Sequence, residues 1–251
     1  MLKTYLKRTG FAVSLWLVTA FAPHAKISVY LIGDSTMAVK QVSAYPETGW
    51  GMPFAHFFDD SVVVVNGAMN GRSTRTFIEE NRWQPISDKL REGDFVLIQF
   101  GHNDEVKTKK SYTTEAEFQS NLQRFIDESQ AKKATPILIT PVARRSFDAS
   151  GKIVDTHTIY AELVRSVAIK NHLPWIDLDK LSRELLQKMG PENSKFLFLH
   201  LEPDEHPNYP EGKEDNTHFS ELGARKMAEL VLADMKRQKI ALSQRVVQKS
   251  K

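Results

Sequence analysis

The sequence contains no cysteine. This absence excludes disulfide bonds, thiolate metal sites, a cysteine nucleophile and a lipid anchor on cysteine. A strong charge imbalance is lacking too, because 34 Lys and Arg stand against 31 Asp and Glu, a net charge of +3. Hydrophobic residues make up 41% and charged residues 26%, which excludes a disordered or polytopic membrane chain. The 251 residues suffice for one large domain, or two small ones, with a sizeable core.

The N-terminal apolar run, Phe11 to Ala22, is short. A membrane anchor would need about 20 apolar residues to span the bilayer. The run follows basic residues and precedes small ones, with cleavage possible after Ala25 or, less readily because of Pro23, after Ala22. This order of charged, apolar and small residues predicts a signal peptide over residues 1–25. We therefore expect an exported protein, periplasmic or extracellular.

The excess of positive charge lies entirely in this predicted signal. Removing residues 1–25 removes three of the 34 basic residues and none of the 31 acidic ones, so the rest of the chain has no formal net charge. Bulk charge then gives no reason to expect a nucleic-acid partner. We also expect no stable membrane association after the signal is removed, and a monomer.

Beyond residue 25, short apolar runs alternate with helical patterns. Five runs rich in β-branched residues predict strands buried on both faces of a parallel sheet: Ile27–Ile32, Val62–Val65, Asp94–Phe100, Pro136–Thr140 and Pro174–Leu178. Three amphipathic patterns predict helices: Glu115–Gln130, Ile159–Lys170 and Ser220–Lys236. The alternation predicts an α/β doubly wound fold in a single domain over residues 26–251.

Two further segments carry structural expectations. The stretch His200–Asn216 is rich in Pro, Glu and Asp, and we expect a long loop that leads straight into the last helix. The polar tail after about Ile240 is expected to fray.

Polar blocks follow three of the predicted strands, where an open parallel sheet binds its ligands. A turn containing Ser35 follows the first strand and would expose its hydroxyl at the sheet edge. Gly71 follows the second strand, and Asn103 follows the third, where its amide could donate to an oxyanion. Each of these residues, taken alone, is more often simply part of a turn.

Asp215 and His218 stand three residues apart, just ahead of the last helix. On one turn the carboxylate could hold one imidazole nitrogen while the other acts as a base. A surface Asp and a helix-capping His are the commoner arrangement for such a pair alone. Together with Ser35, Gly71 and Asn103, however, the pair completes the set of groups needed for acyl transfer through a serine ester.

The blocks GDST, NGAMNGRS, GHND and DNTH, in this order, resemble those of the SGNH/GDSL hydrolases over nearly the whole chain after residue 25. The strings GDSTM, GRSTRTF, FGHNDE and YPEGKEDNTHFSELGAR are similar to the rhamnogalacturonan acetylesterases of carbohydrate esterase family twelve. Thr36 departs from the commoner GDSL form, which has Leu there. The resemblance implies a flavodoxin-like three-layer α/β/α sandwich with a parallel five-stranded sheet.

The resemblance also implies a role for each residue. Ser35 would be the nucleophile, His218 the base and then the acid, and Asp215 the group that orients His218. The N–H groups of Ser35 and Gly71 and the side chain of Asn103 would form the oxyanion hole. No metal or organic cofactor is needed, and the other His and Asp residues show no metal-ligand spacing. The implied function is removal of O-acetyl groups from plant cell-wall polysaccharide, with rhamnogalacturonan of pectin as the expected substrate.

Rhamnogalacturonan carries uronic carboxylates, which arginine can bind in bidentate fashion. Arg72 and Arg75 lie close to Gly71 in the sequence, and Arg144 and Arg145 follow the fourth strand. We hypothesise that some of them bind substrate, the alternative being solvated charge or internal ion pairs. Two tryptophans could stack on sugars, but we expect both in the core: Trp50 and Trp83.

Two rival functions stay open at this point. An esterase of the same fold could act on acetylxylan, another acetylated sugar, a lipid or a thioester, because the same catalytic groups serve all of them. A flavodoxin-like module could instead bind sugar or phosphate without catalysis. Such a module would need neither an exposed Ser35 nor His218 placed after Asp215.

Overall fold

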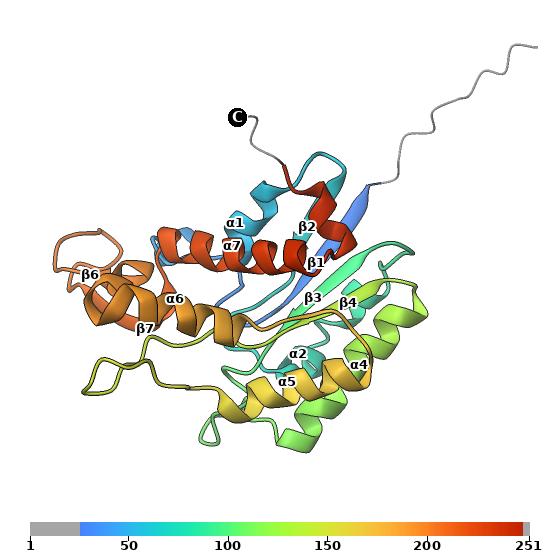
Figure 1. The fold of residues 1–251 in the computed structure, drawn as a ribbon, viewed down its shortest axis with the longest axis horizontal. Helices are drawn as coiled ribbons and strands as arrows, with labels where there is room; N and C mark the ends of the chain where they lie inside the picture. The colour runs from blue at the N-terminus through green and yellow to red at the C-terminus, as the bar shows by residue number, and fades with distance from the viewer. Residues whose placement is uncertain (1–25, 248–251) are drawn as a thin grey trace, which may run out of the picture.

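The computed structural model describes residues 26–247, and the predicted signal peptide, residues 1–25, lies outside the described residues. A central sheet stands between two layers of helices (Figure 1). Its strand order is β2-β1-β3-β4-β5 and all neighbours are parallel. The predicted α/β fold with a parallel five-stranded sheet is thus confirmed. No helix among the described residues is long and apolar enough to cross a membrane.

Each of the predicted apolar runs contains a strand of this sheet. The strands are β1 Ile27–Gly33, β2 Val62–Asn66, β3 Phe95–Gln99, β4 Thr135–Ile139 and β5 Trp175–Ile176. β5 is shorter than predicted because Asp177 caps the next helix, its carboxylate accepting from the N–H of Lys180. β3 is central, and all of its residues are buried.

Alternate residues of the strands pack into two separate hydrophobic cores. Val29 and Leu31 of β1 face the helices α1 Gly51–Phe54, α6 Leu178–Asn193 and α7 Glu221–Arg237. Tyr30 and Ile32 face the helices α2 Thr74–Glu79, α4 Glu115–Ala131 and α5 Thr158–Lys170, with α3 Gln84–Ser87 nearby. Trp50 and Trp83 lie in these cores, as predicted. Burial on both faces explains why the strands are nearly continuous apolar runs.

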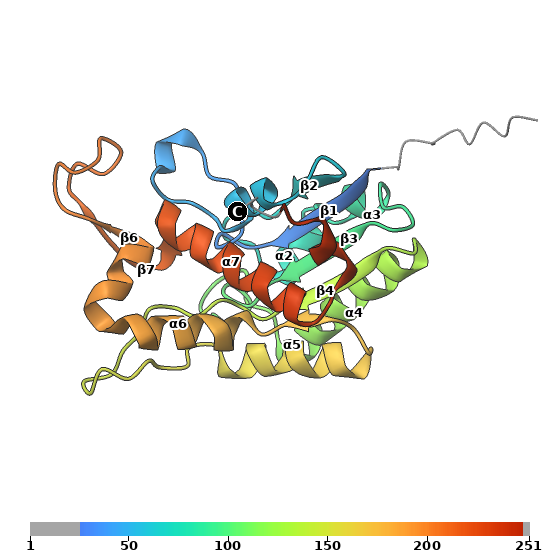
Figure 2. The ribbon, with the colours of Figure 1, turned by 45° about the horizontal axis from the view of Figure 1, so that its top comes forward.

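A second, two-stranded sheet lies in the region predicted as one long loop. β6 Phe198–Leu201 and β7 Lys213–Phe219 pair antiparallel, and residues 202–212 form the turn between them. Most of β7 is polar and partly exposed, so it lacks the apolar alternation by which strands are recognised. The hairpin projects from the main sheet beside the segment that follows β1 (Figure 2), and the side chain of Asn208 donates to the carbonyls of Val42 and Tyr45 there.

The expectation that the tail frays after Ile240 is wrong for residues 241–247. Ala241–Arg245 form a 3₁₀ helix, and Leu242 is fully buried. The N–H of Val247 donates to the carbonyl of Phe57 at 2.8 Å. Even one or two apolar side chains in a polar tail suffice to dock it when they meet an open edge of the core.

Candidate active site

Ser35 lies in the turn that directly follows β1. At Gly33 a Cβ would come within 2.5 Å of the carbonyl oxygen of Gln99 on β3, so glycine is required there. The carboxylate of Asp34 then accepts from the N–H of Thr36 at 2.9 Å and from its hydroxyl at 2.7 Å. This tight turn places Ser35 at the carboxyl edge of the sheet.

Thr36, which stands where the commoner GDSL form has Leu, hydrogen-bonds to a buried neighbour. Its hydroxyl accepts from the side-chain amide of Gln99 at 2.8 Å, and the amide oxygen of Gln99 accepts from the indole N–H of Trp50. Thr36 is 1% exposed and Gln99 is fully buried. The threonine therefore satisfies a buried amide that a leucine would leave with one unpaired donor.

His218 and Asp215 lie on a bulge of β7 rather than on a plain turn. Phe198 and Leu199 are neighbours on β6, but their partners on β7 are Phe219 and Asp215. Residues 216–218, which lie between those partners, are therefore looped out of the ladder. Inside the bulge the carboxylate of Asp215 accepts from the N–H of Thr217 at 2.7 Å and of His218 at 2.9 Å. The bulge thereby folds the imidazole back toward the carboxylate.

Ser35, His218 and Asp215 form a continuous hydrogen-bonded chain. Nδ1 of His218 lies 2.8 Å from Oδ2 of Asp215, and Nε2 lies 2.9 Å from Oγ of Ser35. Partial burial raises the pKa of Asp215, but the hydrogen bonds from the ring and backbone of His218 outweigh it and hold that pKa well below its usual range. A carboxylate that stays ionised can fix the imidazole tautomer that accepts a proton from the serine.

Gly71 and Asn103 come to the same sheet edge. The loop with Gly71 lies along the Ser35 turn, because the N–H of Met69 donates to the carbonyl of Gly33 at 3.0 Å. Gly71 has φ +77°, a conformation that favours glycine. The side chain of Asn103 donates to the carbonyl of Arg72 at 3.1 Å, which ties the two donor segments together.

The Asn103 turn is held by its neighbour Asp104. This buried carboxylate accepts from the N–H and hydroxyl of Thr74 at 2.8 and 2.7 Å, and from the N–H of Gly101 at 3.2 Å. Burial raises the pKa of Asp104 to about 7. The contacts join the end of β3 to the start of α2, so Asn103 sits in a fixed turn between them.

Arg72 and Arg75 have partners within the protein. Nε of Arg72 donates to both carboxylate oxygens of Glu80, at 3.1 and 2.9 Å. Arg75 donates to the carbonyls of Lys110 and Tyr112 and pairs with Glu79. Their charges are thus compensated in this structure, and their hypothesised role in binding substrate stays a prediction.

Arg144 contacts the bulge that carries His218. It donates to the hydroxyl of Thr217 at 3.0 Å and to the carboxylate of Glu105 at 3.1 Å. The other oxygen of Glu105 lies 2.9 Å from Nδ1 of the buried His157. Arg145 donates to the side chain of Asn216 at 2.8 Å. Both arginines therefore hold residues of the bulge itself.

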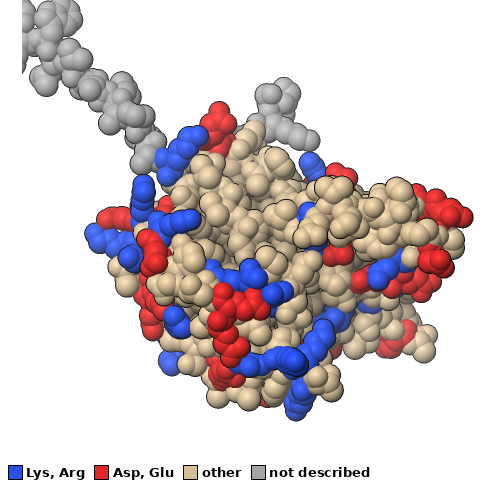
Figure 3. Space-filling view, turned by 180° about the vertical axis from the view of Figure 1, so that it is seen from behind, with Lys and Arg blue, Asp and Glu red and all other residues tan. Residues whose placement is uncertain are grey.

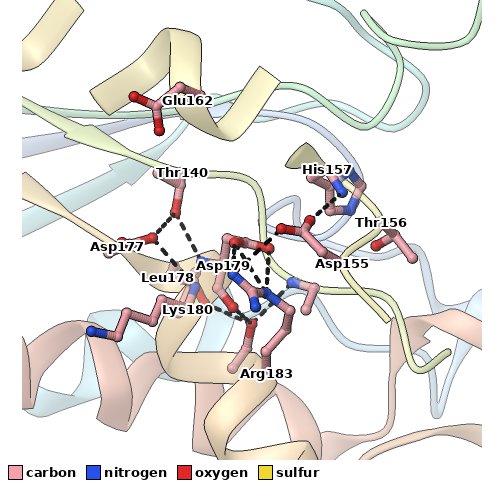
Figure 4. Close-up of polar contacts among 12 residues, drawn as sticks. Thr140, Asp155, Thr156, His157, Glu162, Asp177, Leu178, Asp179, Lys180 and Arg183 are labelled. Atoms are coloured by element: carbon pink, nitrogen blue, oxygen red, sulfur yellow. Dashed lines mark hydrogen bonds and ion pairs between the residues drawn. The ribbon is translucent and has the colours of Figure 1, made fainter. Parts of the chain in front are cut away.

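The segment that carries these arginines is anchored on α6 (Figure 4). The hydroxyl of Thr140 accepts from the N–H of Asp179 at 2.8 Å, and the N–H of Ala143 donates to the hydroxyl of Ser182 at 2.9 Å. Asp179 is fully buried and pairs with Arg183 at 2.7 Å. A rigid support of this kind lets Arg144 position the bulge rather than merely touch it.

Sequence reasoning missed several polar residues that brace the site. They are Lys40, Glu105, His157 and Thr217. Glu105 directly follows the GHND block and Thr217 lies between Asp215 and His218, so adjacency was the one available signal. Nothing in the sequence marks Lys40, because its burial depends on the packing of distant segments. Among residues 26–247, no group of three His, Asp or Glu side chains is placed to hold a metal ion.

The fold and the hydrogen-bonded serine, histidine and aspartate agree with an ester hydrolase. Residues 31–226 match the GDSL-like lipase/acylhydrolase family, and the chain belongs to this family. It is 44% identical to rhamnogalacturonan acetylesterase RhgT of Bacillus subtilis (strain 168) over 206 residues, 82% of this chain and 88% of RhgT. It is 32% identical to the probable rhamnogalacturonan acetylesterase YesY of the same organism, over 87% of this chain and 97% of YesY. The protein is therefore a carboxylic ester hydrolase.

Solved structures agree on the fold. The crystal structure of YxiM from Bacillus subtilis has a TM-score of 0.74 and 28% identity, over 86% of this chain and 58% of that one. A catalytic mutant of the acetylxylan esterase Axe2 from Geobacillus stearothermophilus has a TM-score of 0.61 over 83% of this chain and 94% of that one. At 19% identity, the second likeness concerns the fold alone.

Proposed function

We propose that this protein is an exported esterase that removes acetyl groups from rhamnogalacturonan through an acetyl-enzyme on Ser35. The observation that carries the proposal is the continuous hydrogen-bonded chain from Ser35 through His218 to Asp215. It stands in a chain that is 44% identical to a rhamnogalacturonan acetylesterase.

In the first half of the reaction, Nε2 of His218 takes the proton of the Ser35 hydroxyl while Oγ attacks the acetyl carbonyl carbon. The negative charge that develops on the carbonyl oxygen is stabilised by the N–H groups of Ser35 and Gly71 and the amide of Asn103. The tetrahedral intermediate collapses, the bond to the sugar oxygen breaks, and the imidazolium of His218 protonates that oxygen. The deacetylated sugar leaves and an acetyl ester remains on Ser35.

In the second half, water takes the place of the sugar. The oxygen of the water attacks the carbonyl carbon of the acetyl ester while His218 accepts a proton from that water. His218 then gives this proton to Oγ of Ser35 as the ester bond breaks. Acetate leaves and the free enzyme is restored. Asp215 stays ionised throughout and stabilises the imidazolium, in keeping with its lowered pKa.

The charges around the site support an acidic polymer as substrate. Lys107, Lys109 and Lys110 are exposed on the loop that begins after Asn103. None of the ion pairs among residues 26–247 includes them, in contrast to Arg72 and Arg144. On the face in Figure 3, basic side chains run along the lower edge, and basic and acidic side chains are interspersed over the rest. Lysines that lie close to Asn103 and form no ion pair can attract uronic carboxylates.

Export is proposed on the N-terminal sequence alone. Residues 1–25 have the order of a signal peptide and carry all of the net positive charge. N-terminal sequencing of protein from the periplasm or medium should give Lys26 as the first residue. Protein confined to the cytoplasm would contradict export, and exported protein that still starts at Met1 would contradict cleavage of residues 1–25.

The experiment that tests the function measures acetate release from a panel of acetylated polymers. The panel holds rhamnogalacturonan, acetylxylan and acetylated homogalacturonan, with a small neutral acetyl ester as reference, and compares wild type with Ser35→Ala. We expect the highest kcat/KM on rhamnogalacturonan and no hydrolysis by the folded Ser35→Ala variant. Equal hydrolysis of the small ester by both proteins would exclude the serine mechanism. Preference for acetylxylan would keep the mechanism and replace the substrate.

A further inference from the structure

Lys40 is a buried cation beside the active site. Its side chain is 1% exposed, and its ammonium lies 2.6 Å from the carbonyl oxygen of Ser35, 2.9 Å from Oδ1 of Asn70 and 2.6 Å from Oε1 of Glu47. An ammonium has three N–H donors, so these acceptors use all of them. Glu47 compensates the charge, which a buried lysine requires.

The acceptors belong to the segments that carry the catalytic groups. Ser35 is the nucleophile itself, and Asn70 directly precedes Gly71. Glu47 precedes Thr48, whose N–H donates to the carbonyl of Phe219 at 3.0 Å. Phe219 directly follows His218, so Lys40 joins the nucleophile, the oxyanion donor and the neighbourhood of the base at one atom.

We propose that Lys40 is a positioning residue that sets the placement of Ser35, Gly71 and His218 relative to one another. The inference rests on the proposed function, because those residues are its catalytic groups. They come from the ends of β1 and β2 and from β7, which are far apart in the sequence.

The Gly71 loop shows how the bracing works. Lys40 holds Asn70 on one side of Gly71, and Asn103 holds the carbonyl of Arg72 on the other. The Gly71 peptide is thereby held from both ends, although its φ of +77° and the open space around its Cα leave glycine free to move. Removing Lys40 releases one of the two ends.

The test compares Lys40→Met with wild type on a small neutral acetyl ester. Methionine has a similar length but no donor, so the three oxygens lose their common partner. We expect kcat to fall about 10- to 100-fold, since a misplacement of about 1 Å can cost 10²-fold, while KM changes little. The affinity for a boronic acid inhibitor that forms a tetrahedral adduct on Ser35 should fall by the same factor as kcat/KM.

Asp94→Leu is the matched control. Asp94 is 4% exposed and accepts from the N–H groups of Ser28 and Arg91, both at 2.9 Å, at the amino ends of the strands and away from the catalytic groups. It should lower the melting temperature while kcat, measured well below that temperature, stays at the wild-type value. Glu47→Gln keeps an acceptor for Lys40 and should lose less activity than Lys40→Met.

Failure of this inference and failure of the proposed function give different results. A folded Lys40→Met variant with wild-type kcat and inhibitor affinity would overturn the inference and leave the proposed function intact. A wild-type protein that hydrolyses no acetyl ester would overturn the proposed function instead. If Lys40→Met does not fold, Asn70→Ala decides the question, because it removes only the arm toward Gly71. Wild-type kcat and inhibitor affinity in that variant would contradict the inference.

Discussion

Asn103 has two tasks at a single amide group. It holds the carbonyl of Arg72 and is the proposed side-chain donor to the oxyanion. We predict that Asn103→Ala lowers kcat on acetyl esters by about 10²- to 10³-fold, the usual loss for one oxyanion donor. The exposed Asn193→Ala is the control and should keep the wild-type kcat. A loss confined to KM would argue against donation in the transition state.

Arg144 and Arg72 should behave differently when truncated. Arg144 holds Thr217 in the bulge, so Arg144→Ala should lower kcat on the small neutral ester and on acidic polymer alike. Arg72 pairs only with an exposed carboxylate and a nearby carbonyl. If it also binds uronate, Arg72→Ala raises KM on the polymer but not on the small ester. Equal effects of Arg72→Ala on both substrates would reject that role.

His102 links stability to pH. Burial lowers the pKa of His102 well below its ordinary value of 6.5. As the pH falls below 6.5, the exposed His102 of the unfolded chain takes up a proton, whereas the buried His102 of the folded chain does not. The free energy of unfolding therefore falls as the pH falls. Relative to His102→Gln, wild type should lose up to about 2 kcal/mol between pH 8 and pH 5.

Urea unfolding of both proteins at the two pH values measures this difference. Asp104, whose pKa is raised to about 7, shifts stability in the opposite direction, but it is present in both proteins and cancels. A difference that does not change with pH would mean that His102 is protonated to the same extent in the folded and unfolded chains.

At the scale of elements, α7 packs unusually close to its neighbour. A Cβ on Gly223 would lie 1.7 Å from the carbonyl oxygen of Leu197. Gly223→Ala must therefore push the helix away, and we predict a loss of about 3 kcal/mol or more in the free energy of unfolding. Leu222→Ala, at a half-exposed neighbour in the same helix, should change it by less than about 1 kcal/mol. Thermal melts of the two variants decide between a packing effect and simple helix propensity.

Most of the long elements with an apolar pattern could be predicted from the sequence. The helix α6 was missed, although its buried Leu178, Ser182 and Leu186 repeat every four residues. β3 was predicted because it is a continuous apolar run, and α4 because its buried residues repeat every three or four positions. The hairpin of β6 and β7 was missed because its polar strand is fixed by pairing across a long turn. The candidate catalytic residues were recognisable at strand ends, but the bulge that joins Asp215 to His218 has no local signature.

At the scale of the whole molecule, charge can guide the polymer to the site. Reversing Lys107, Lys109 and Lys110 to Glu should raise KM for acidic rhamnogalacturonan severalfold, with kcat on the small neutral ester unchanged. The same change at Lys89, Lys132 and Lys170, which are exposed and precede the amino ends of strands, is the matched control. The difference should vanish at high salt, because screening removes long-range attraction. Equal KM values for the two triple variants would mean that the three lysines after Asn103 do not guide the polymer to the site.

The proposed nucleophile, Ser35, and the proposed base, His218, are 183 residues apart in the chain. During synthesis, Ser35 emerges early and has no proton acceptor until the hairpin near the C-terminus has been made. Refolding has the same order of events, since contacts between distant segments close late. Ellipticity from the helices should therefore recover before esterase activity, and the protein has no hydrolytic power while it is still incomplete.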